Sequence, residues 1–395
     1  MPLEADFPEI SRRSFLQMSS AALACRFLTE PMLAHAAVEG GEYPKDAIRI
    51  NSNENPLGPC AVARDAVAAV APDGGRYEFH FTEKLLKTFC DQQGLTKEYV
   101  HPVAGSTPAL SFAVGAFTSP RASCVTAEPG YDAVAHLTQA RGARLVAVPL
   151  TRTWSHDVRA MLAAAPDAGI FYICMPNNPT GTLTSHDDIE YLLEHKPKGS
   201  IVMVDEAYIH FSDAPSALDL VKADKDIIVL RTFSKLYGMA GLRCGFAIAR
   251  PDLLNRIVTY GGSNPMPITA CAAATASLNQ ANLVAERKAI NSTVRQATFD
   301  WLDRNGYQYS PSVSNCFMLN AGKPAHEVIS AMAQQNVFIG RPWPSMPNWV
   351  RITVGTQAEM EHFQIAFQQL MKGKVVGRLH DPLVARNLDG VMLPA

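Results

Sequence analysis

The sequence predicts an α/β fold with a mainly parallel β-sheet, followed by a smaller α+β domain. Short apolar runs alternate with amphipathic stretches from Ala47 onward, and several runs are apolar throughout, as expected for strands covered on both faces. The predicted strands are 123–126, 145–148, 170–174, 201–204 and 227–230, with helices between them such as 131–141 and 187–195. This alternation is typical of parallel sheets, which bind ligands beyond the carboxyl ends of their strands.

The pattern changes after about residue 280. A long helix-like run at 281–305 precedes an apolar strand at 317–320, a helix near 327–335 and a strand at 349–354. Helices and strands in this order predict a second, smaller domain. The tail from Gly377 onward shows little helical pattern.

Composition excludes several classes of protein. The chain has 395 residues, 47% of them hydrophobic and 18% charged, with a formal net charge of −2, which is ordinary for a globular protein of one large and one smaller domain. No basic stripe indicates a nucleic-acid or membrane-surface partner, and no apolar run reaches the roughly 20 residues that span a bilayer. The eight cysteines are scattered without a C-x-x-C pair, so neither a zinc site nor a disulfide framework is expected.

The N-terminus resembles a bacterial twin-arginine export signal. Arg12 and Arg13 lie in the run Ser-Arg-Arg-Ser-Phe-Leu, an apolar stretch follows, and Ala34 and Ala36 form a small-residue cleavage pattern. This predicts export of the folded protein to the periplasm, loaded with any cofactor made in the cytoplasm. The alternative is a cytoplasmic protein with a chance pair of arginines.

Lys235 lies beside small hydroxyl residues and before a glycine-rich turn. A lysine that forms a Schiff base needs a carbonyl partner and a low local dielectric, so that enough of it is the neutral nucleophile. The nearby Thr232, Ser234 and Arg243 suit a phosphate. An aldehyde that brings its own phosphate is pyridoxal 5′-phosphate (PLP), whose chemistry depends on the protein for orientation and electrostatics. The alternative is an ordinary Ser-Lys pair in a capping loop.

Two further polar groups follow predicted strands. Asn177 and Asn178 lie in a turn fixed by prolines and a glycine, and an asparagine amide there can donate to the phenolic oxygen of PLP. Asp205 comes at the end of an apolar strand, where a carboxylate holds the pyridine nitrogen protonated and keeps the ring an electron sink. Taken singly, an Asn-Pro turn and a helix N-cap explain them equally well.

Three more segments complete the candidate pocket. Ser106 and Thr107 precede an apolar helix, and backbone N–H groups at a helix N-terminus with hydroxyls beside them bind anions. Tyr131 follows a strand and is placed to stack on a pyridine ring, or to fill the core. Arg351 lies in an apolar strand, where a guanidinium is costly unless it binds an anion of the protein or the substrate.

In their order and spacing, these segments resemble the fold-type I PLP-dependent aminotransferases, most closely the histidinol-phosphate aminotransferase group. The resemblance covers roughly residues 47–372, and its motifs lie at 51–59, 76–77, 176–181, 205–208, 232–235 and 350–356. Each motif alone is weak, whereas the ordered set is specific. The resemblance implies a large domain with a mainly parallel sheet of the seven-stranded type.

The resemblance also implies roles for single residues. Lys235 bonds covalently to the cofactor and then moves the proton, Asp205 pairs with the pyridinium, and Arg351 binds the substrate carboxylate or phosphate. The other implied cofactor ligands are Asn178 and Tyr208 for the phenolic oxygen, Tyr131 for the ring, and Ser106, Thr107, Thr232, Ser234 and Arg243 for the phosphate. Tyr77 is implied to reach the phosphate of a neighbouring subunit in a homodimer, and Arg341 and Asn55 join the substrate-binding set.

The chain is expected to divide into five parts. They are a twin-arginine signal and linker (1–45), an N-terminal arm joining the small domain (46–75), the large PLP-binding domain (76–280), the small domain (281–375) and a C-terminal tail (376–395).

The predicted activity is transfer of an amino group between an amino acid or amino phosphate and a 2-oxo acid. An aromatic amino acid aminotransferase, a PLP decarboxylase, lyase or oxidase on the same scaffold, and a non-catalytic PLP-binding protein are the alternatives. Two departures from the family pattern concern the substrate. Residues 78–81 stand where the family has a proline, and the segment 341–347 is unusually apolar and stiff.

Overall fold

The computed structural model describes residues 42–262 and 265–372. From Tyr43 onward, the described residues belong to one compact unit. The predicted export signal, except for the last residues of its linker, and the predicted tail 376–395 lie outside the described residues. Among the described residues, no helix is both long enough and apolar enough to cross a bilayer.

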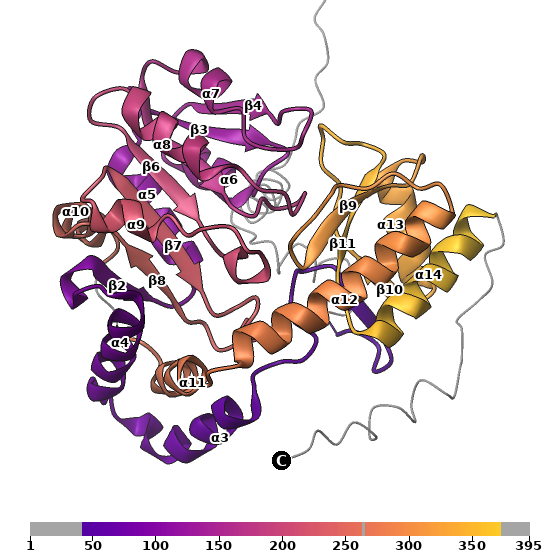
Figure 1. Cartoon of the computed structure of the whole chain (residues 1–395), viewed down its shortest axis with the longest axis horizontal. Coiled ribbons are helices and arrows are strands. Elements are labelled where there is room, and N and C mark those ends of the chain that lie inside the picture. The colour runs from indigo at the N-terminus through magenta and orange to yellow at the C-terminus, as the bar shows by residue number, and fades with distance from the viewer. Residues whose placement is uncertain (1–41, 263–264, 373–395) are drawn as a thin grey trace, which may run out of the picture. The chain divides into compact units, whose positions relative to one another are not determined.

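The large domain is built on a seven-stranded sheet with the order β2-β8-β7-β6-β5-β3-β4 (Figure 1). All neighbours pair in parallel except β8, which runs antiparallel to both β2 and β7. The strands are β2 (Val100–Val103), β3 (Ser123–Glu128), β4 (Leu145–Pro149), β5 (Ala168–Cys174), β6 (Ile201–Asp205), β7 (Ile227–Thr232) and β8 (Gly245–Ile248). The mainly parallel sheet and its five predicted strands are confirmed.

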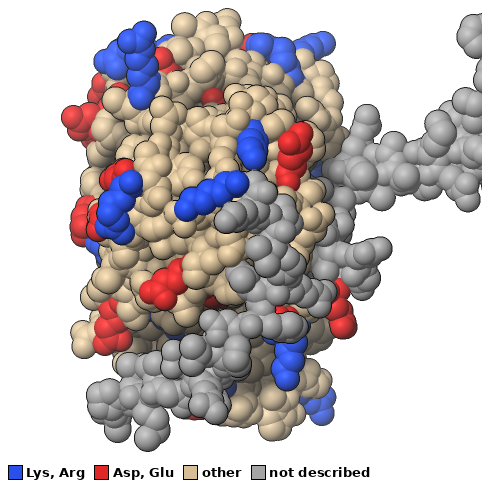
Figure 2. Space-filling model, turned by 90° about the vertical axis from the view of Figure 1, so that its right-hand side faces the viewer, with Lys and Arg blue, Asp and Glu red and all other residues tan. Residues whose placement is uncertain are grey.

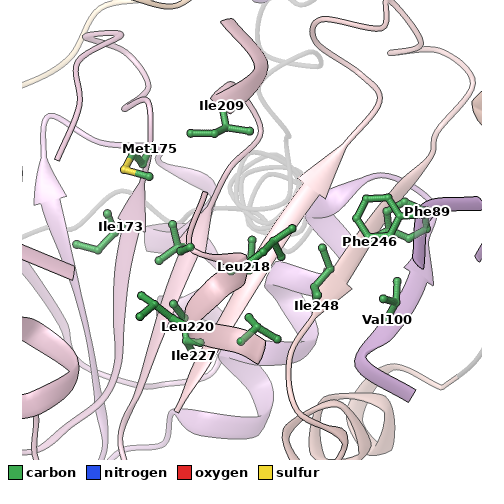
Figure 3. Packing of buried hydrophobic residues seen from close by; sticks show 14 of the residues in the cluster. Phe89, Val100, Ile173, Met175, Ile209, Leu218, Leu220, Ile227, Phe246 and Ile248 are labelled. Carbon is green, nitrogen blue, oxygen red and sulfur yellow. The ribbon is translucent and has the colours of Figure 1, made fainter. Parts of the chain in front are cut away.

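Helices cover both faces of this sheet. Alternate side chains of β6 and β7 point to opposite faces, so that Val204 and Val229 enter one apolar cluster and Met203 and Leu230 enter the other. The first cluster (Figure 3) is covered by α3 (Ala61–Val70), α4 (His80–Gln93), α7 (Val158–Ala164), α8 (His186–His195), α9 (Leu218–Lys222) and α11 (Ile268–Leu278). The second is covered by α5 (Ser106–Phe117), α6 (Ala133–Ala140) and α10 (Pro251–Gly261). Burial on both faces explains why these strands are apolar throughout.

The parallel register brings the ends of three strands to one edge. Cys174 at the end of β5 pairs with Asp205 at the end of β6, and Asp205 pairs with Leu230 near the end of β7. The polar segments that follow these strands therefore meet at the carboxyl edge of the sheet, where ligands bind in open α/β folds.

The small domain has its own apolar core. β1 (Ile48–Ile50) pairs in parallel with β10 (Val337–Ile339), and β9 (Cys316–Asn320) pairs antiparallel with β11 (Trp349–Thr353). Three helices accompany them, α12 (Leu283–Arg304), α13 (Ala325–Gln334) and α14 (Gln357–Met371). Figure 2 views this side of the molecule, where lysine, arginine, aspartate and glutamate side chains are interspersed over the described surface.

The predicted arm, residues 46–75, divides between the two domains. Its strand β1 pairs with β10 of the small domain, whereas its helix α3 packs against α11 of the large domain. Three short 3-10 helices complete the described elements, η2 (Ala71–Gly75), η3 (Lys97–Tyr99) and η4 (Ile209–Phe211). The predicted boundary near residue 280 falls between α11 and α12.

Candidate active site

Three segments of the large domain form a cradle suited to a phosphate. Nη1 of Arg243 donates to Oγ of Ser234 at 3.2 Å, and Oγ1 of Thr232 donates to the same oxygen at 2.9 Å. Gly105 precedes α5 with φ +83°, and a Cβ added there would overlap Nη2 of Arg243. A Cβ on Gly245 would lie 3.1 Å from the backbone N of Ser106. Hydroxyls, a guanidinium and the N-terminus of a twelve-residue helix thus meet, as an anion site requires.

This cradle gives the first prediction. Gly105→Ala places a methyl group against the Arg243 guanidinium at a backbone φ that L-residues rarely adopt, so we expect PLP to bind at least about tenfold more weakly, for a cost of roughly 1–3 kcal/mol. Equilibrium titration of the apoprotein with PLP measures this. The matched control is Gly142→Ala, which has a similar φ of +65° and open space around its Cβ. Equal PLP affinity in wild type and Gly105→Ala would contradict the assignment of this cradle.

Asp205 is a buried carboxylate at the end of β6. Oη of Tyr172 donates to its Oδ2 at 2.9 Å, and the backbone N of Ala207 donates to its Oδ1 at 3.1 Å. Burial raises the pKa of Asp205 to about 6, although these two hydrogen bonds and the charge of Lys235 oppose the shift. Among the described residues, no ion pair joins it to a cationic side chain, and a buried carboxylate of this kind fits a protonated pyridine nitrogen.

Lys235 lies in the segment after β7, facing the same edge. Its Nζ donates to the carbonyl oxygen of Ser52 at 3.4 Å and lies 5.4 Å from the centroid of the Tyr208 ring. Burial is the main cause that lowers the pKa of Lys235, and the charge of Arg243 lowers it further. Both effects increase the fraction of neutral amine, which is the form that attacks a carbonyl or takes a proton.

Two amides converge on the hydroxyl of Tyr208. Nδ2 of Asn178 lies 3.4 Å from this oxygen and Nδ2 of Asn53 lies 3.0 Å from it. Asn53 is fully buried, and Thr353 of β11 donates to its Oδ1 at 3.1 Å. Asn53 is not among the site residues predicted from the sequence. The available signal was its place in the motif 51–59, where a buried asparagine with φ +53° is an uncommon feature.

Arg351 is fully buried in β11 and links the two domains at the site. Its Nη1 donates to Oδ1 of Asn178 at 2.9 Å, and its Nη2 donates to the carbonyl oxygen of Asn51 at 2.5 Å. Burial lowers the pKa of Arg351 to about 9. Because these two partners are neutral oxygens, they do not cancel the positive charge of the guanidinium, which remains available to bind an anion.

The remaining predicted residues have the following places. Tyr131 is half-buried. Burial raises the pKa of its hydroxyl, and a hydrogen bond with Thr107 opposes part of this shift. Asn55 donates from Nδ2 to the carbonyl oxygen of Leu236 at 2.7 Å, so its amide supports the chain next to Lys235. Tyr77 is 72% exposed, with its ring stacked on Phe79.

Arg341 has a partner that was not foreseen. It forms an ion pair with Asp132, the residue after Tyr131, and its guanidinium carbon lies 4.6 Å from the centroid of the Trp343 ring. Arg341 was predicted to be a second cation for the substrate, but the carboxylate of Asp132 already neutralises its charge.

An anion cradle, a buried carboxylate that has no ion-pair partner within residues 42–262 and 265–372, and a lysine with a lowered pKa lie together at one edge of a mainly parallel sheet. Each fits one part of PLP, namely its phosphate, its pyridine nitrogen and its aldehyde. The fold and the site define a PLP-dependent enzyme of fold type I. The chain belongs to the family described as aminotransferase class I and II, whose profile matches residues 45–366. It is a PLP-dependent aminotransferase.

Individual relatives agree with this family. The chain is 34% identical over 346 residues to an aromatic amino acid aminotransferase of Cutibacterium acnes, covering 85% of this chain and 96% of the relative. It is 33% identical over 324 residues to a histidinol-phosphate aminotransferase of Symbiobacterium thermophilum, covering 80% and 89%. The solved histidinol-phosphate aminotransferase from Sinorhizobium meliloti in complex with pyridoxal 5′-phosphate has the same fold, with a TM-score of 0.79 at 24% identity over 88% of this chain and 95% of that one.

Proposed function

We propose that this site moves an amino group between an amino acid or amino phosphate and a 2-oxo acid, as in the histidinol-phosphate aminotransferase group. The observation that carries the proposal is the bond between Arg351 and Asn178. It sets the cation for a substrate carboxylate directly beside the amide that would hold the phenolic oxygen of PLP. A substrate carboxylate bound by Arg351 would thereby lie next to the cofactor.

The residues of the chain divide the work. PLP, when bound, supplies the electron sink that weakens the bonds at the substrate α-carbon. Asp205 would hold the ring nitrogen protonated, and Thr232, Ser234 and Arg243 would hold the phosphate. Nζ of Lys235 takes the proton from the substrate α-carbon, because burial keeps part of this amine neutral.

The proposal predicts a large effect at Arg351. Replacing Arg351 by glutamine removes a charge-assisted pair with the substrate, so we expect KM for amino donors and 2-oxo acids to rise about 10- to 100-fold. Steady-state kinetics with several donor and acceptor pairs measure this. Arg256→Gln is the control, since Arg256 donates to the carbonyl oxygen of Ala116 and lies over the Phe117 ring, outside the residues assigned to the site. An unchanged KM for every substrate would remove Arg351 from the binding site.

An aromatic amino acid is the second candidate substrate. Trp343 is 4% exposed, and its ring lies 5.5 Å from the guanidinium carbon of Arg351. It therefore offers an aromatic wall next to the carboxylate-binding cation. Two relatives at 33–34% identity carry the name aromatic amino acid aminotransferase.

We also propose that the enzyme works as a homodimer in which Tyr77 reaches the cofactor phosphate of the other subunit. The support is the exposure of Tyr77 and of the neighbouring Phe79, 72% and 62%. Mixing inactive Lys235→Ala protein with weakened Tyr77→Ala protein tests it. A shared site predicts recovered activity, because one site of each hybrid dimer combines an intact Lys235 with an intact Tyr77. Absence of recovery in verified hybrid dimers would contradict the proposal.

Location in the periplasm through the twin-arginine motif is a further proposal, supported by Arg12, Arg13 and the pattern at Ala34–Ala36 in the sequence. A reporter fused after Ala36 should be exported when both arginines are present and retained when both are replaced by lysine. Equal export of the two fusions would contradict it.

A further inference from the structure

A segment of the small domain crosses to the large domain beside the substrate site. We refer to residues 341–345, which follow β10, as the strap. Trp343 donates from Nε1 to the carbonyl oxygen of Gly130 at 3.1 Å, and Ser345 donates to Oε1 of Glu128 at 2.5 Å. Arg341 adds the ion pair with Asp132. Three side chains of the strap are thus fixed to the loop that carries Tyr131.

The strap lies on the substrate side of the site. The backbone N of Gly340, which immediately precedes it, donates to the carbonyl oxygen of Arg351 at 2.8 Å. The Trp343 ring has the guanidinium carbons of Arg341 and Arg351 at 4.6 and 5.5 Å from its centroid. Asp132 follows Tyr131 directly and pairs with Arg341, so it connects the loop of the predicted ring-stacking residue to the strap.

Asp132 determines the net charge of the group formed by Arg341, Arg351 and itself beside the Trp343 ring. Arg351 and Arg341 bring two positive charges, and Asp132 brings one negative charge, so these three side chains leave a single positive charge. Glu128, the other acidic group of the loop, bonds to Ser345 at the opposite end of the strap, and among the described residues it forms no ion pair with Arg341, so it is not counted with these three side chains. A net charge of one matches the single carboxylate of an amino acid whose side chain is uncharged.

Arg341 is held away from other partners. Its Nε and Nη2 are inaccessible to solvent and have no hydrogen-bond partner among the described residues, so its one ionic contact is with Asp132. A second anionic group on the substrate would have to compete with this carboxylate for Arg341 and would meet its negative charge. Repulsion of this kind is a recognised source of specificity.

We propose that Asp132 is a specificity-determining residue that neutralises Arg341 and so favours amino donors with an uncharged side chain over phosphorylated or dicarboxylic donors. This inference rests on the proposed aminotransferase function and narrows its substrate class. Asp132 acts through Arg341 and has no part in the proton transfer.

The half-reaction with one amino donor tests the proposal without interference from the acceptor. Holoenzyme is mixed with phenylalanine, glutamate or histidinol phosphate, and the change in PLP absorbance gives the rate and apparent affinity for each. We expect wild type to prefer phenylalanine. Asp132→Asn keeps the size of the side chain and removes its charge, so the preference should shift toward glutamate and histidinol phosphate by roughly tenfold.

Further variants separate charge from a structural effect. Asp132→Glu should restore the wild-type preference, and the double variant Asp132→Asn/Arg341→Gln should cancel the shift because the released cation is gone. Asp132→Ser is the second charge-removing variant, used if Asp132→Asn does not fold. Asp91→Asn breaks an exposed ion pair with Lys87 and should change nothing.

Three results would overturn the inference. They are a wild-type preference for histidinol phosphate, an unmoved preference in the variants without the Asp132 charge, and a shift that persists in the double variant. If instead wild type reacted with no amino donor at all, the proposed function itself would be wrong, so the two failures are distinguishable.

Discussion

Replacing Lys235 by alanine is expected to reduce transamination by at least about 10²- to 10⁴-fold, the usual contribution of a positioned acid–base group. The loss should exceed this range because the same amine also bonds to the cofactor. Burial lowers the pKa of Lys235, so this residue supplies a neutral amine that an exposed lysine does not. Single-turnover measurements of the half-reaction give the rate of the chemical step directly.

Two comparisons make the Lys235 result specific. Lys235→Arg keeps a positive charge but cannot lose its proton, so it should be as inactive as Lys235→Ala. Lys84→Ala, on the exposed surface of α4, should behave as wild type. A Lys235→Ala enzyme with a half-reaction rate within tenfold of wild type would show that another group moves the proton.

Asp205→Asn is expected to have the second largest effect, a fall in kcat of roughly 10²- to 10³-fold, as is typical when one fixed electrostatic group of an active site is lost. Asparagine is close in shape and retains an oxygen for the Tyr172 hydroxyl, but it has no negative charge to keep a pyridine nitrogen protonated. Holoenzyme kinetics at saturating PLP measure the effect.

The same substitution has a stability effect of known sign in the apoprotein. The pKa of Asp205 is raised from 3.8 to about 6, so the folded state prefers the protonated acid, and stability falls as the pH rises through this interval. Above pH 6 the charged carboxylate destabilises the apoprotein by about 3 kcal/mol, at about 1.4 kcal/mol for each unit of pKa shift. Apo Asp205→Asn should therefore equal or exceed wild type in unfolding free energy at pH 8, with a smaller difference at pH 5.

PLP should reverse that order. The buried charge of Asp205 destabilises the apoprotein, but in the holoenzyme it would pair with the pyridinium and become stabilising. PLP should therefore raise the unfolding free energy of wild type more than that of Asp205→Asn. Equal stabilisation of the two proteins by PLP, together with equal kcat, would show that Asp205 does not face the ring nitrogen.

The sequence was sufficient where a function depends on the end of an apolar strand. Asp205 ends β6 and Thr232 ends β7, and Asn178 follows the neighbouring strand β5. The parallel sheet alone therefore brings these residues to one edge. Composition limited what could be foreseen elsewhere. β2 has the sequence Val-His-Pro-Val, so no continuous apolar run marks it as a strand.

Contacts between distant segments were beyond sequence reasoning. Asn53 meets Tyr208 across 155 residues, and Asp132 meets Arg341 across 209, and neither pairing follows from local pattern. Both pairings depend on how the small domain packs against the large one, because Asn53 follows β1 and Arg341 follows β10, and both strands belong to the small domain. The substrate side of the proposed site therefore depends more on such contacts than the cofactor side does.

Reduction of the holoenzyme with borohydride, followed by peptide mass spectrometry, tests the central assignment most directly. Borohydride fixes PLP to the lysine that holds it. We expect one modified peptide, carrying the cofactor mass on Lys235, and no modified peptide from Lys235→Ala protein. Cofactor mass on a different lysine, or an unchanged adduct in Lys235→Ala, would contradict it.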